Sequence, residues 1–366
     1  MQLLIMIIHA VVLAFAALTG FAYLTLLERK VLARLQHRVG PNRAGPRGFF
    51  QPLADAVKLM FKEDIMPAEA NKFVFTLAPI MATIPAIVLF AVIPLGKPLN
   101  LFGYEVNLAY ADLNIGLLYI LAITSIGVYG ITLGGWASNN KYSMLGGVRS
   151  AAQMISYELA FGLAVIVPVM LTAWRNETGM DLGKEILPPG VGTLSLVGIV
   201  DAQQGTWFGF IPKWFIFTPT GWLAFAVFLI AATAEVTRAP FDLVEAEQEL
   251  VGGYATEYSS MKFALFFMAE YMKLIAMSAL AATLFLGGWR FPGLEDIGGN
   301  LGAILSFVVM VAKIFVFLFL SIWVRATLPR IRYDTLMSFG WKRLLPVSLF
   351  AMAATAVIIV LVSPLS

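Results

Sequence analysis

The sequence contains no cysteine, and its two histidines, His9 and His37, lie far apart in the chain. Iron–sulfur clusters are held by several cysteine thiolates, so this chain cannot ligate one. Two widely separated histidines do not favour a haem site, and no glycine-rich phosphate-binding loop follows a strand pattern. We therefore expect no metal site and no resident cofactor. Any electrons must arrive on a cofactor that belongs to another protein.

Charged residues are also scarce. Only 13% of the 366 residues are charged, whereas 60% are apolar and the mean hydropathy is +0.83. This composition is typical of a protein whose solvent is the lipid bilayer. We predict an all-α polytopic membrane protein of about eight transmembrane helices, in one integral membrane domain over residues 1–366. The predicted spans are residues 3–27, 73–95, 115–135, 152–174, 214–234, 263–286, 301–324 and 344–362.

Two of these runs need comment. The first has no basic region before it and no small-residue cleavage site, and a basic loop follows it, so we expect a retained helix. The fifth is the weakest, because Pro219 and Gly221 interrupt it.

The loop charges predict an orientation. The odd-numbered loops carry most of the 25 Lys and Arg residues, and the even-numbered loops carry five. Cytoplasmic loops of membrane proteins hold an excess of basic residues. We therefore expect the odd-numbered loops in the cytoplasm and both termini on the outer, periplasmic side.

The first inner loop, residues 28–72, contains a segment that is too short to span the membrane. Residues 49–62 predict an amphipathic helix with Pro52 in its first turn. One interpretation is a membrane-surface anchor. The other is the wall of a tunnel, whose polar stripe faces Arg29 and Arg38 and admits an amphipathic ligand. The stripe consists of Gln51, Asp55, Lys58 and Lys62, opposite Phe50, Leu53, Val57, Met60 and Phe61.

The third inner loop, residues 235–262, is unusually acidic. Only Arg238 and Lys262 offset its carboxylates. Crowded carboxylates repel each other's ionised forms, so some of them should exchange protons near neutral pH. The alternative is a solvated acidic surface that binds a basic partner. The acidic residues are Glu235, Asp242, Glu245, Glu247, Glu249 and Glu257.

Ionisable side chains inside a membrane cost about 2.5–3.5 kcal/mol each on insertion scales, so they are candidates for function. Glu158 has no basic partner nearby in sequence, which favours a proton-relay role. Glu270 and Lys273 lie one turn apart, either as an intrahelical pair that neutralises itself or as part of a path. Phe263 and Phe267 share a helix face with Glu270, which indicates either plain packing or a passage for a quinone headgroup.

Several motifs together resemble one family, the complex I membrane subunit that is designated H in bacteria and 1 in mitochondria. The resemblance covers nearly the whole chain. The most specific segments are LERKV (27–31), RVGPNR (38–43), QPLADAVK (51–58), FKED (61–64), SYE (156–158), RAPFDL (238–243), EAEQEL (245–250) and FMAEY (267–271).

The resemblance implies a subunit of a proton-pumping NADH:quinone oxidoreductase in the bacterial inner membrane, inactive alone and without a nucleic-acid partner. Its partners would be the other membrane and hydrophilic subunits, the bilayer, and ubiquinone or menaquinone as substrate. NADH, FMN and the iron–sulfur clusters would bind in partner subunits. The implied quinone-binding residues are Arg29, Arg38, Asp55, Phe263 and Phe267. The implied proton path comprises Glu158, Glu235, Asp242, Glu245, Glu247, Glu249 and Glu270.

Two departures from relatives are evident. Some relatives carry a glutamate in the third helix where this chain has Ser125, so a proton path there would rest on hydroxyls, water or a neighbouring subunit. The outer loop over residues 175–213 is longer than in compact relatives, and it has no functional account.

Two alternative functions remain open from the sequence. A solute or cation transporter also needs carboxylates inside the membrane, but this chain shows no repeated half. A subunit of a ferredoxin- or hydrogenase-linked complex would share the fold and differ only in its electron donor.

Overall fold

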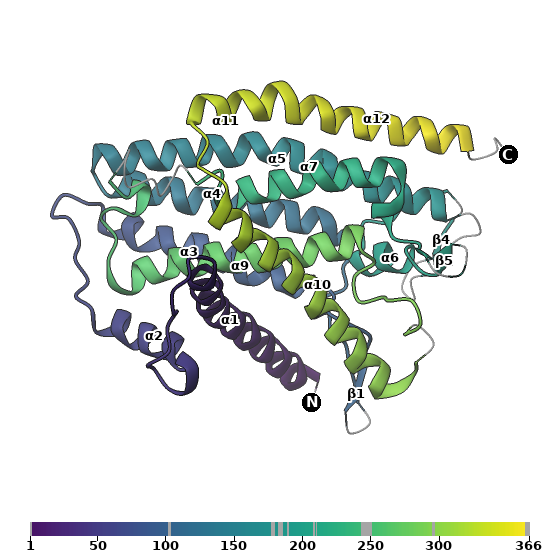
Figure 1. Ribbon diagram of the computed structural model, residues 1–366, viewed down its shortest axis with the longest axis horizontal. Helices are drawn as coiled ribbons and strands as arrows, with labels where there is room; N and C mark the ends of the chain where they lie inside the picture. Colours follow the sequence, from purple (N-terminus) through teal and green to yellow (C-terminus); the bar gives the residue numbers. More distant parts are fainter. Residues whose placement is uncertain are drawn as a thin grey trace.

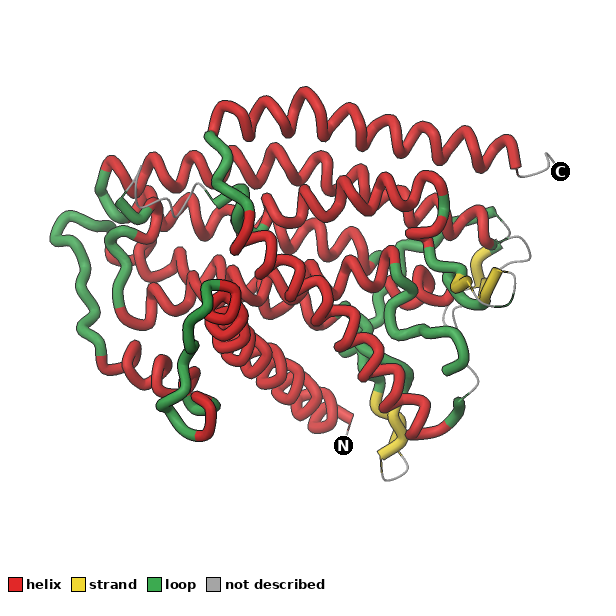
Figure 2. The backbone as a smooth tube through the Cα atoms, in the orientation of Figure 1, coloured by secondary structure: helices red, strands yellow, loops and turns green. Residues whose placement is uncertain are grey.

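The computed structural model describes residues 2–101, 104–176, 180–181, 186–188, 190–207, 209, 211–242, 251–294 and 297–362. Long helices run side by side along the longest axis, and α10 and α1 cross them at an angle (Figure 1). Strands are few and short, and they lie at the edge of the helical body (Figure 2). The prediction of an all-α polytopic membrane protein is therefore confirmed.

Seven helices in the described residues are long and apolar enough to span a membrane. The fifth predicted span corresponds to the shorter apolar helix α7, with 17 residues or about 25 Å. The spanning helices are α1 (Gln2–Leu35), α3 (Lys72–Val88), α4 (Gly116–Ala137), α5 (Lys141–Arg175), α7 (Pro219–Glu235), α9 (Ser260–Phe285), α10 (Gly299–Thr327) and α12 (Leu345–Val362).

The remaining elements of the described residues are short. They are η1 (Pro46–Gly48), α2 (Gln51–Phe61), η2 (Leu89–Ala91), β1 (Leu99–Leu101), β2 (Tyr104–Val106), β3 (Met180–Asp181), β4 (Ile186–Leu187), α6 (Leu196–Asp201), β5 (Thr206–Trp207), β6 (Ile211–Pro212), η3 (Phe215–Phe217), η4 (Gly253–Ala255), α11 (Tyr333–Phe339) and the π-helical η5 (Gly340–Leu344). Each antiparallel hairpin, β1–β2, β3–β4 and β5–β6, pairs neighbouring strands.

The start of α7 explains why the fifth span is shorter than predicted. Thr218 caps the helix, because its side chain accepts a hydrogen bond from the Gly221 amide. Pro219 occupies the first turn, where a missing amide hydrogen does no harm. The residues before this cap form the short turn η3 instead of transmembrane helix.

Helix α5 begins well before the predicted residue 152. Asn140 caps it by accepting a hydrogen bond from the Tyr142 amide, and the helix then continues for 35 residues to Arg175. The predicted start at residue 152 would place Glu158 within the first two turns of its helix, and that placement is wrong. Hydropathy located only the apolar part of this helix, and Glu158 lies near its middle.

Helix α2 confirms the short helix that was predicted in the loop after α1, with a proline in its first turn. It lies beside α1, outside the main body of helices (Figure 1). None of its residues is buried, and Phe61 on its apolar side is 87% exposed. Its apolar face is thus available to lipid or to another subunit.

The packed core lies where α3, α4, α5, α7 and α9 meet. Helix α9 is central to it and carries a run of buried small residues, among them Ala276, Ala279 and Ala282. Gly130 lets α4 approach α3 closely, because a Cβ atom there would come within 2.5 Å of the Ala82 nitrogen. Small residues at such contacts are typical of helix packing inside membranes.

Lys313 of α10 stabilises the turn that follows α9. Its Nζ donates hydrogen bonds of 2.6, 2.7 and 2.7 Å to the carbonyls of Leu286, Gly288 and Arg290, and it lies 4.3 Å from the Trp214 ring centroid. The single cation therefore satisfies three carbonyl groups that follow the end of a helix.

We expect Lys313→Met to destabilise the protein, because each buried carbonyl left without a donor costs about 1–3 kcal/mol. The thermal unfolding midpoint of the detergent-solubilised protein should fall clearly below that of the wild type. Lys342→Met is the matched control, since Lys342 is an exposed residue of η5. Equal midpoints for the two variants would contradict a structural role for Lys313.

Candidate functional site

The segment from Val236 to Asp242 forms a buried loop at the end of α7. Gln153 of α5 fixes it from one side, donating to the carbonyls of Ala234 and Phe241 at 3.0 and 2.9 Å. The Ile331 amide, which follows α10, donates to the Pro240 carbonyl at 3.0 Å. Thr237 has a left-handed φ of 57°, a conformation that the surrounding contacts must stabilise.

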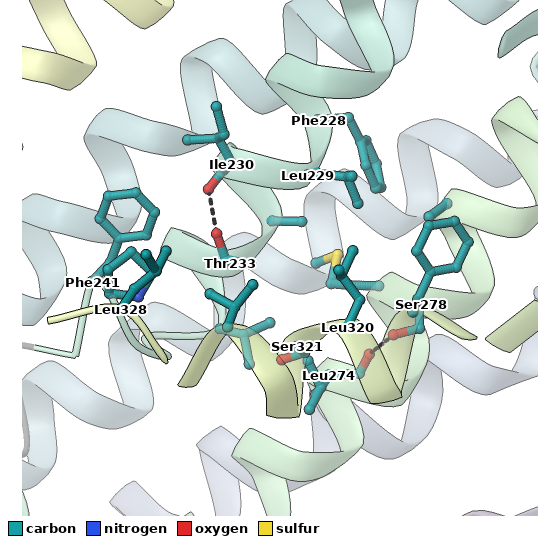
Figure 3. Close-up of a pocket in the computed structure, with 17 residues that line it drawn as sticks. Phe228, Leu229, Ile230, Thr233, Phe241, Leu274, Ser278, Leu320, Ser321 and Leu328 are labelled. Carbon is teal, nitrogen blue, oxygen red and sulfur yellow. Dashed lines mark hydrogen bonds between the residues drawn. The ribbon is translucent and has the colours of Figure 1, made fainter. Parts of the chain in front are cut away.

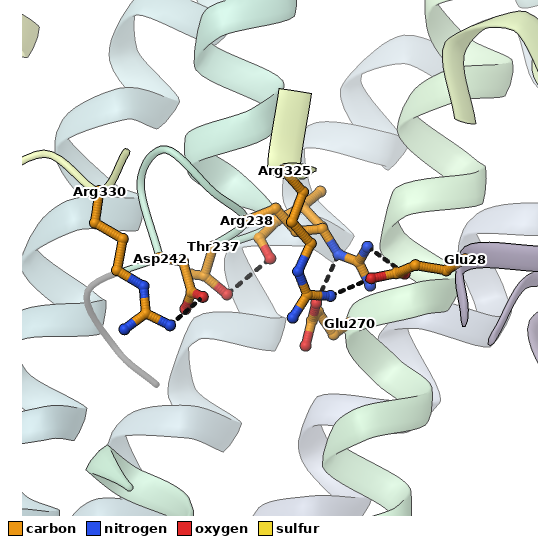
Figure 4. A network of polar contacts seen from close by, with 8 residues as sticks. Glu28, Thr237, Arg238, Asp242, Glu270, Arg325 and Arg330 are labelled. Atoms are coloured by element: carbon orange, nitrogen blue, oxygen red, sulfur yellow. Dashed lines mark hydrogen bonds and ion pairs between the residues drawn. The ribbon is translucent and has the colours of Figure 1, made fainter. Parts of the chain in front are cut away.

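Arg238 is the centre of this loop and is only 2% exposed (Figure 4). Its Nη1 bonds Glu28 of α1 at 2.7 Å, and its Nε bonds Glu270 of α9 at 2.7 Å. Its guanidinium also lies 4.1 Å from the Tyr271 ring centroid. Arg325 of α10 pairs with the second oxygen of Glu28. One arginine thus joins three distant parts of the chain.

This Glu28–Arg238–Glu270–Arg325 network has equal numbers of acids and bases. Burial by itself opposes the charge on Arg238, but the carboxylates of Glu270 and Glu28 outweigh it, so the Arg238 pKa lies above its ordinary value. Arg238 therefore stays charged. Its Nη2 has no hydrogen-bond partner among the described residues. The network thus has one donor left for water or another group.

Asp242 ends the described part of the loop and extends the line of charges. One of its oxygens bonds Arg330 at 3.3 Å, and the other has no hydrogen-bond partner in the described chain. The predicted site residues Glu245, Glu247 and Glu249 follow directly, but they lie outside the described residues.

Glu235 and Lys273 form a second buried pair next to this network. The Lys273 Nζ lies 3.9 Å from a Glu235 oxygen, which is too long for a strong hydrogen bond. Both Glu235 oxygens and the Lys273 Nζ lack hydrogen-bond partners within the described ranges. Gly127 of α4 makes room for the lysine, because a Cβ atom there would lie 3.0 Å from its Nζ.

A small internal cavity of about 20 Å³ connects the two clusters. Glu235, Glu270 and Lys273 all line it, together with Thr237. A cavity of roughly 10–15 Å³ is enough for one water molecule if polar groups surround it. Glu270 and Glu235 therefore share one polar cavity that is large enough for a water molecule.

These contacts exclude the intrahelical pair between Glu270 and Lys273. Each residue pairs with a different helix or loop: Glu270 with Arg238, and Lys273 with Glu235. Spacing of one turn makes an intrahelical pair possible, but it does not reveal that each side chain pairs with a different part of the fold.

Glu158 hydrogen-bonds Ser125 of α4 across the helix interface. Ser125 is the position at which the resemblance implies a glutamate in some relatives. Its hydroxyl also lies 2.9 Å from the Leu121 carbonyl, so its one hydrogen can point to either acceptor. A hydroxyl therefore occupies the place where a second carboxylate would stand, and it can still hold a proton between neighbours.

A separate group of predicted residues meets where α1, α2 and α9 come together. Arg29 of α1 bonds Asp55 of α2 at 2.6 Å, and Gln51 also donates to Asp55 at 3.2 Å. Phe263 and Phe267 of α9 stack with their ring centroids 6.3 Å apart. Ser260 Oγ donates to the Leu59 carbonyl at 2.9 Å and so attaches α2 to α9.

Not every predicted residue joins this α1–α2–α9 face. Arg38 lies beyond the end of α1, where its Nε bonds Gln36 at 2.9 Å. Phe266 packs edge-to-face against Tyr254 and Tyr258, so it does not belong to the face that holds the Phe263–Phe267 stack. The face therefore retains Arg29, Asp55 and the Phe263–Phe267 stack.

Sequence reasoning missed Glu28, Arg238 and Arg325 as site residues. Glu28 lies in a strongly basic segment, so it did not stand out as an acidic site residue. Arg325 at the end of α10 has the position expected of a loop arginine that only sets membrane orientation. Arg238 did offer a signal, because a lone arginine among acids directly after a membrane helix needs a buried partner.

Comparison with known proteins gives one consistent result. A sequence profile described as NADH dehydrogenase matches residues 8–356 of the chain. The chain is 50% identical over 347 residues to the NADH-quinone oxidoreductase subunit designated H 1 of Geobacter metallireducens, covering 95% of this chain and 94% of that protein. It is 51% identical over 352 residues to the NADH-quinone oxidoreductase subunit designated H of Deinococcus deserti, covering 96% and 82%. The corresponding protein of Deinococcus radiodurans is 49% identical over 367 residues, covering 98% and 84%.

Proposed function

Because this chain belongs to the NADH dehydrogenase family, as a membrane subunit of an NADH-quinone oxidoreductase, we propose that it guides quinone and couples quinone reduction to proton movement. Quinone would approach along the α1–α2–α9 face. The proton path would run through the carboxylates at the ends of α7 and α9. The subunit acts as part of a translocase complex and would have no activity alone.

One observation supports this proposal most directly: two consecutive residues of α1 contact the proposed quinone face and the buried charge network, respectively. Arg29 pairs with Asp55 of α2 on the proposed quinone side. Its neighbour Glu28 pairs with Arg238 and Arg325 in the buried network. A change of charge or contact at Arg29 would therefore act within one turn of α1 on Glu28, and through it on the buried network.

The proton path would work by exchange among groups that cannot all be ionised cheaply. Reduction of quinone in the neighbouring subunit would add negative charge at the beginning of this path, which would favour proton uptake by the carboxylates nearest to it. Glu270 can give a proton to water in the small cavity, and Glu235 can accept it there. Glu158 and Ser125 would continue the path between α4 and α5, and Asp242 with Glu245, Glu247 and Glu249 would begin it.

The redox chemistry would take place in partner subunits. NADH, FMN and iron–sulfur clusters would bind there, and the reacting headgroup of the quinone would lie in a neighbouring hydrophilic subunit. The names of the relatives give NADH as the donor, which favours this over a ferredoxin- or hydrogenase-linked complex. We place the loops containing α2 and Arg238 on the cytoplasmic side of the bacterial inner membrane, with both termini outside.

We expect Asp55→Asn to lower kcat/KM for quinone by about tenfold, equivalent to roughly 1.4 kcal/mol, because Arg29 loses its charged partner on α2. NADH oxidation by a water-soluble artificial acceptor should remain nearly unchanged, since that route does not use the membrane subunit. Both activities are measured on the assembled complex in liposomes.

Asp64→Asn is the matched control. It removes the same charge in the neighbouring segment and breaks the 2.8 Å pair with Lys262, but it does not touch Arg29. An equal loss of both activities in Asp55→Asn would indicate a global defect. Unchanged quinone kinetics would leave α2 as a membrane-surface anchor.

A further inference from the structure

An apolar cavity of about 280 Å³ lies between α7, α9 and α10, apart from the groups discussed so far (Figure 3). Its walls include Phe228 of α7, Val236 directly after that helix, and Leu274, Met277 and Ala281 of α9. Leu320, Val324 and Leu328 complete it from the side of α10. The cavity is open to the outside, because Leu320 is 39% exposed and Leu328 is 50% exposed. In a membrane this opening faces lipid or a neighbouring subunit.

Thr233 and Ser278 line the cavity, but each donates its hydroxyl hydrogen within its own helix. Thr233 Oγ1 donates to the Ile230 carbonyl of its own helix at 2.8 Å, and Ser278 Oγ donates to the Leu274 carbonyl at 2.8 Å (Figure 3). An apolar cavity of about 150 Å³ in another protein binds benzene. This cavity is nearly twice as large, so it has room for a slender hydrocarbon of roughly ten or more carbon atoms.

One cationic side chain, Arg330, lies near one end of the cavity. Pro240 lines the cavity, and its carbonyl accepts the Ile331 amide at 3.0 Å, which brings the segment after α10 to the rim. Arg330 lies next in that segment, and its side chain is 45% exposed. One of its nitrogens bonds Asp242, and a guanidinium has further N–H groups that can bind a phosphate.

We propose that this cavity holds one acyl chain of an anionic phospholipid, with the lipid phosphate bound at Arg330. The apolar wall favours a hydrocarbon chain, and the guanidinium of Arg330 near the cavity favours a negatively charged headgroup. A quinone tail is less suited, because it brings no phosphate. The Arg238–Tyr271 contact also separates Leu274 from the Phe263–Phe267 stack along α9. The proposal does not depend on the quinone path.

The test uses the assembled complex in vesicles that contain phospholipid with a photoactivatable group in the acyl chain. One preparation contains the phosphatidylglycerol form and the other the phosphatidylcholine form. After illumination, labelled peptides are identified by mass spectrometry. We expect labelling around Met277–Ala281 and Leu320–Leu328 to be several-fold stronger with phosphatidylglycerol. The exposed face of α12 around Phe350 should be labelled equally by both lipids and serves as the internal reference.

Two variants sharpen the result. Arg330→Gln should lower phosphatidylglycerol labelling of the cavity to the phosphatidylcholine level. Ala281→Phe should remove cavity labelling by filling the space, and Leu320→Trp at the exposed mouth replaces it if the buried change prevents folding. Equal labelling by both lipids, or absence of cavity label, would overturn the proposal. Displacement of the label by excess long-tailed quinone would assign the cavity to quinone instead.

Discussion

Replacing Arg238 by glutamine is expected to prevent accumulation of the active complex. The change leaves the buried carboxylates of Glu28 and Glu270 without the cation that they share. Breaking a buried ion pair by removing one partner costs about 3–5 kcal/mol. That is a large part of the total stability of a typical protein domain. Native gels of solubilised membranes should show little assembled complex, and quinone-dependent NADH oxidation should fall in parallel.

Arg238→Lys tests the geometry as well as the charge. A lysine has one compact cationic group, whereas the arginine contacts Glu28 and Glu270 through two different nitrogens. We therefore expect partial assembly and reduced turnover. Arg332→Gln is the control, because among the described residues the ion pair of that arginine is an exposed one, with Asp334 at 3.2 Å. Wild-type assembly and turnover in Arg238→Gln would show that the network has no structural or functional importance.

Replacing Glu235 by glutamine is expected to lower coupled turnover by about tenfold or more, without loss of assembly. Glutamine keeps the size of the side chain but cannot titrate. Proton transfer by a positioned side chain contributes roughly 10²–10⁴-fold, and water can bypass part of a lost position. Glu158→Gln should also lower coupled turnover, because its Ser125 partner cannot supply a carboxylate. The loop acid Glu247, with other acids beside it in sequence, should matter less.

The measurement is proton translocation per electron pair in liposomes that contain the intact complex. Asp334→Asn is the control, since it removes one carboxylate at an exposed position of α11. A double variant with both Glu158 and Glu235 neutralised gives the strictest result. Wild-type turnover together with wild-type pumping in that variant would rule out a relay through these residues.

The sequence predicted the helices well where hydropathy alone determines them. It placed helix ends poorly where a polar capping residue determines the first residue of the helix. Asn140 extends α5 by a polar first part that hydropathy cannot detect, and Thr218 with Pro219 delays the start of α7. The amphipathic pattern of α2 was enough to predict it, because its period is visible without any tertiary contact.

The site was only partly predictable, and the reason is distance along the chain. Motifs identified Arg29, Asp55, Glu235 and Glu270 one by one. They could not predict that Arg238 reaches Glu28 across 210 positions of sequence, or that Glu270 prefers Arg238 to Lys273. Such pairings depend on how α1, α9 and the loop after α7 pack together, which no local pattern contains.

The adjacency of Glu28 and Arg29 in α1 has a thermodynamic consequence. About 100° of helix separates two consecutive side chains, so one residue faces Asp55 while its neighbour faces the buried arginines. Suppose that an occupant of the α2 side raises the proton affinity of the network by some factor. Linkage then requires a bound proton to tighten the hold on that occupant by the same factor. The protein would retain its quinone while a proton is loaded and release it more readily once that proton has left.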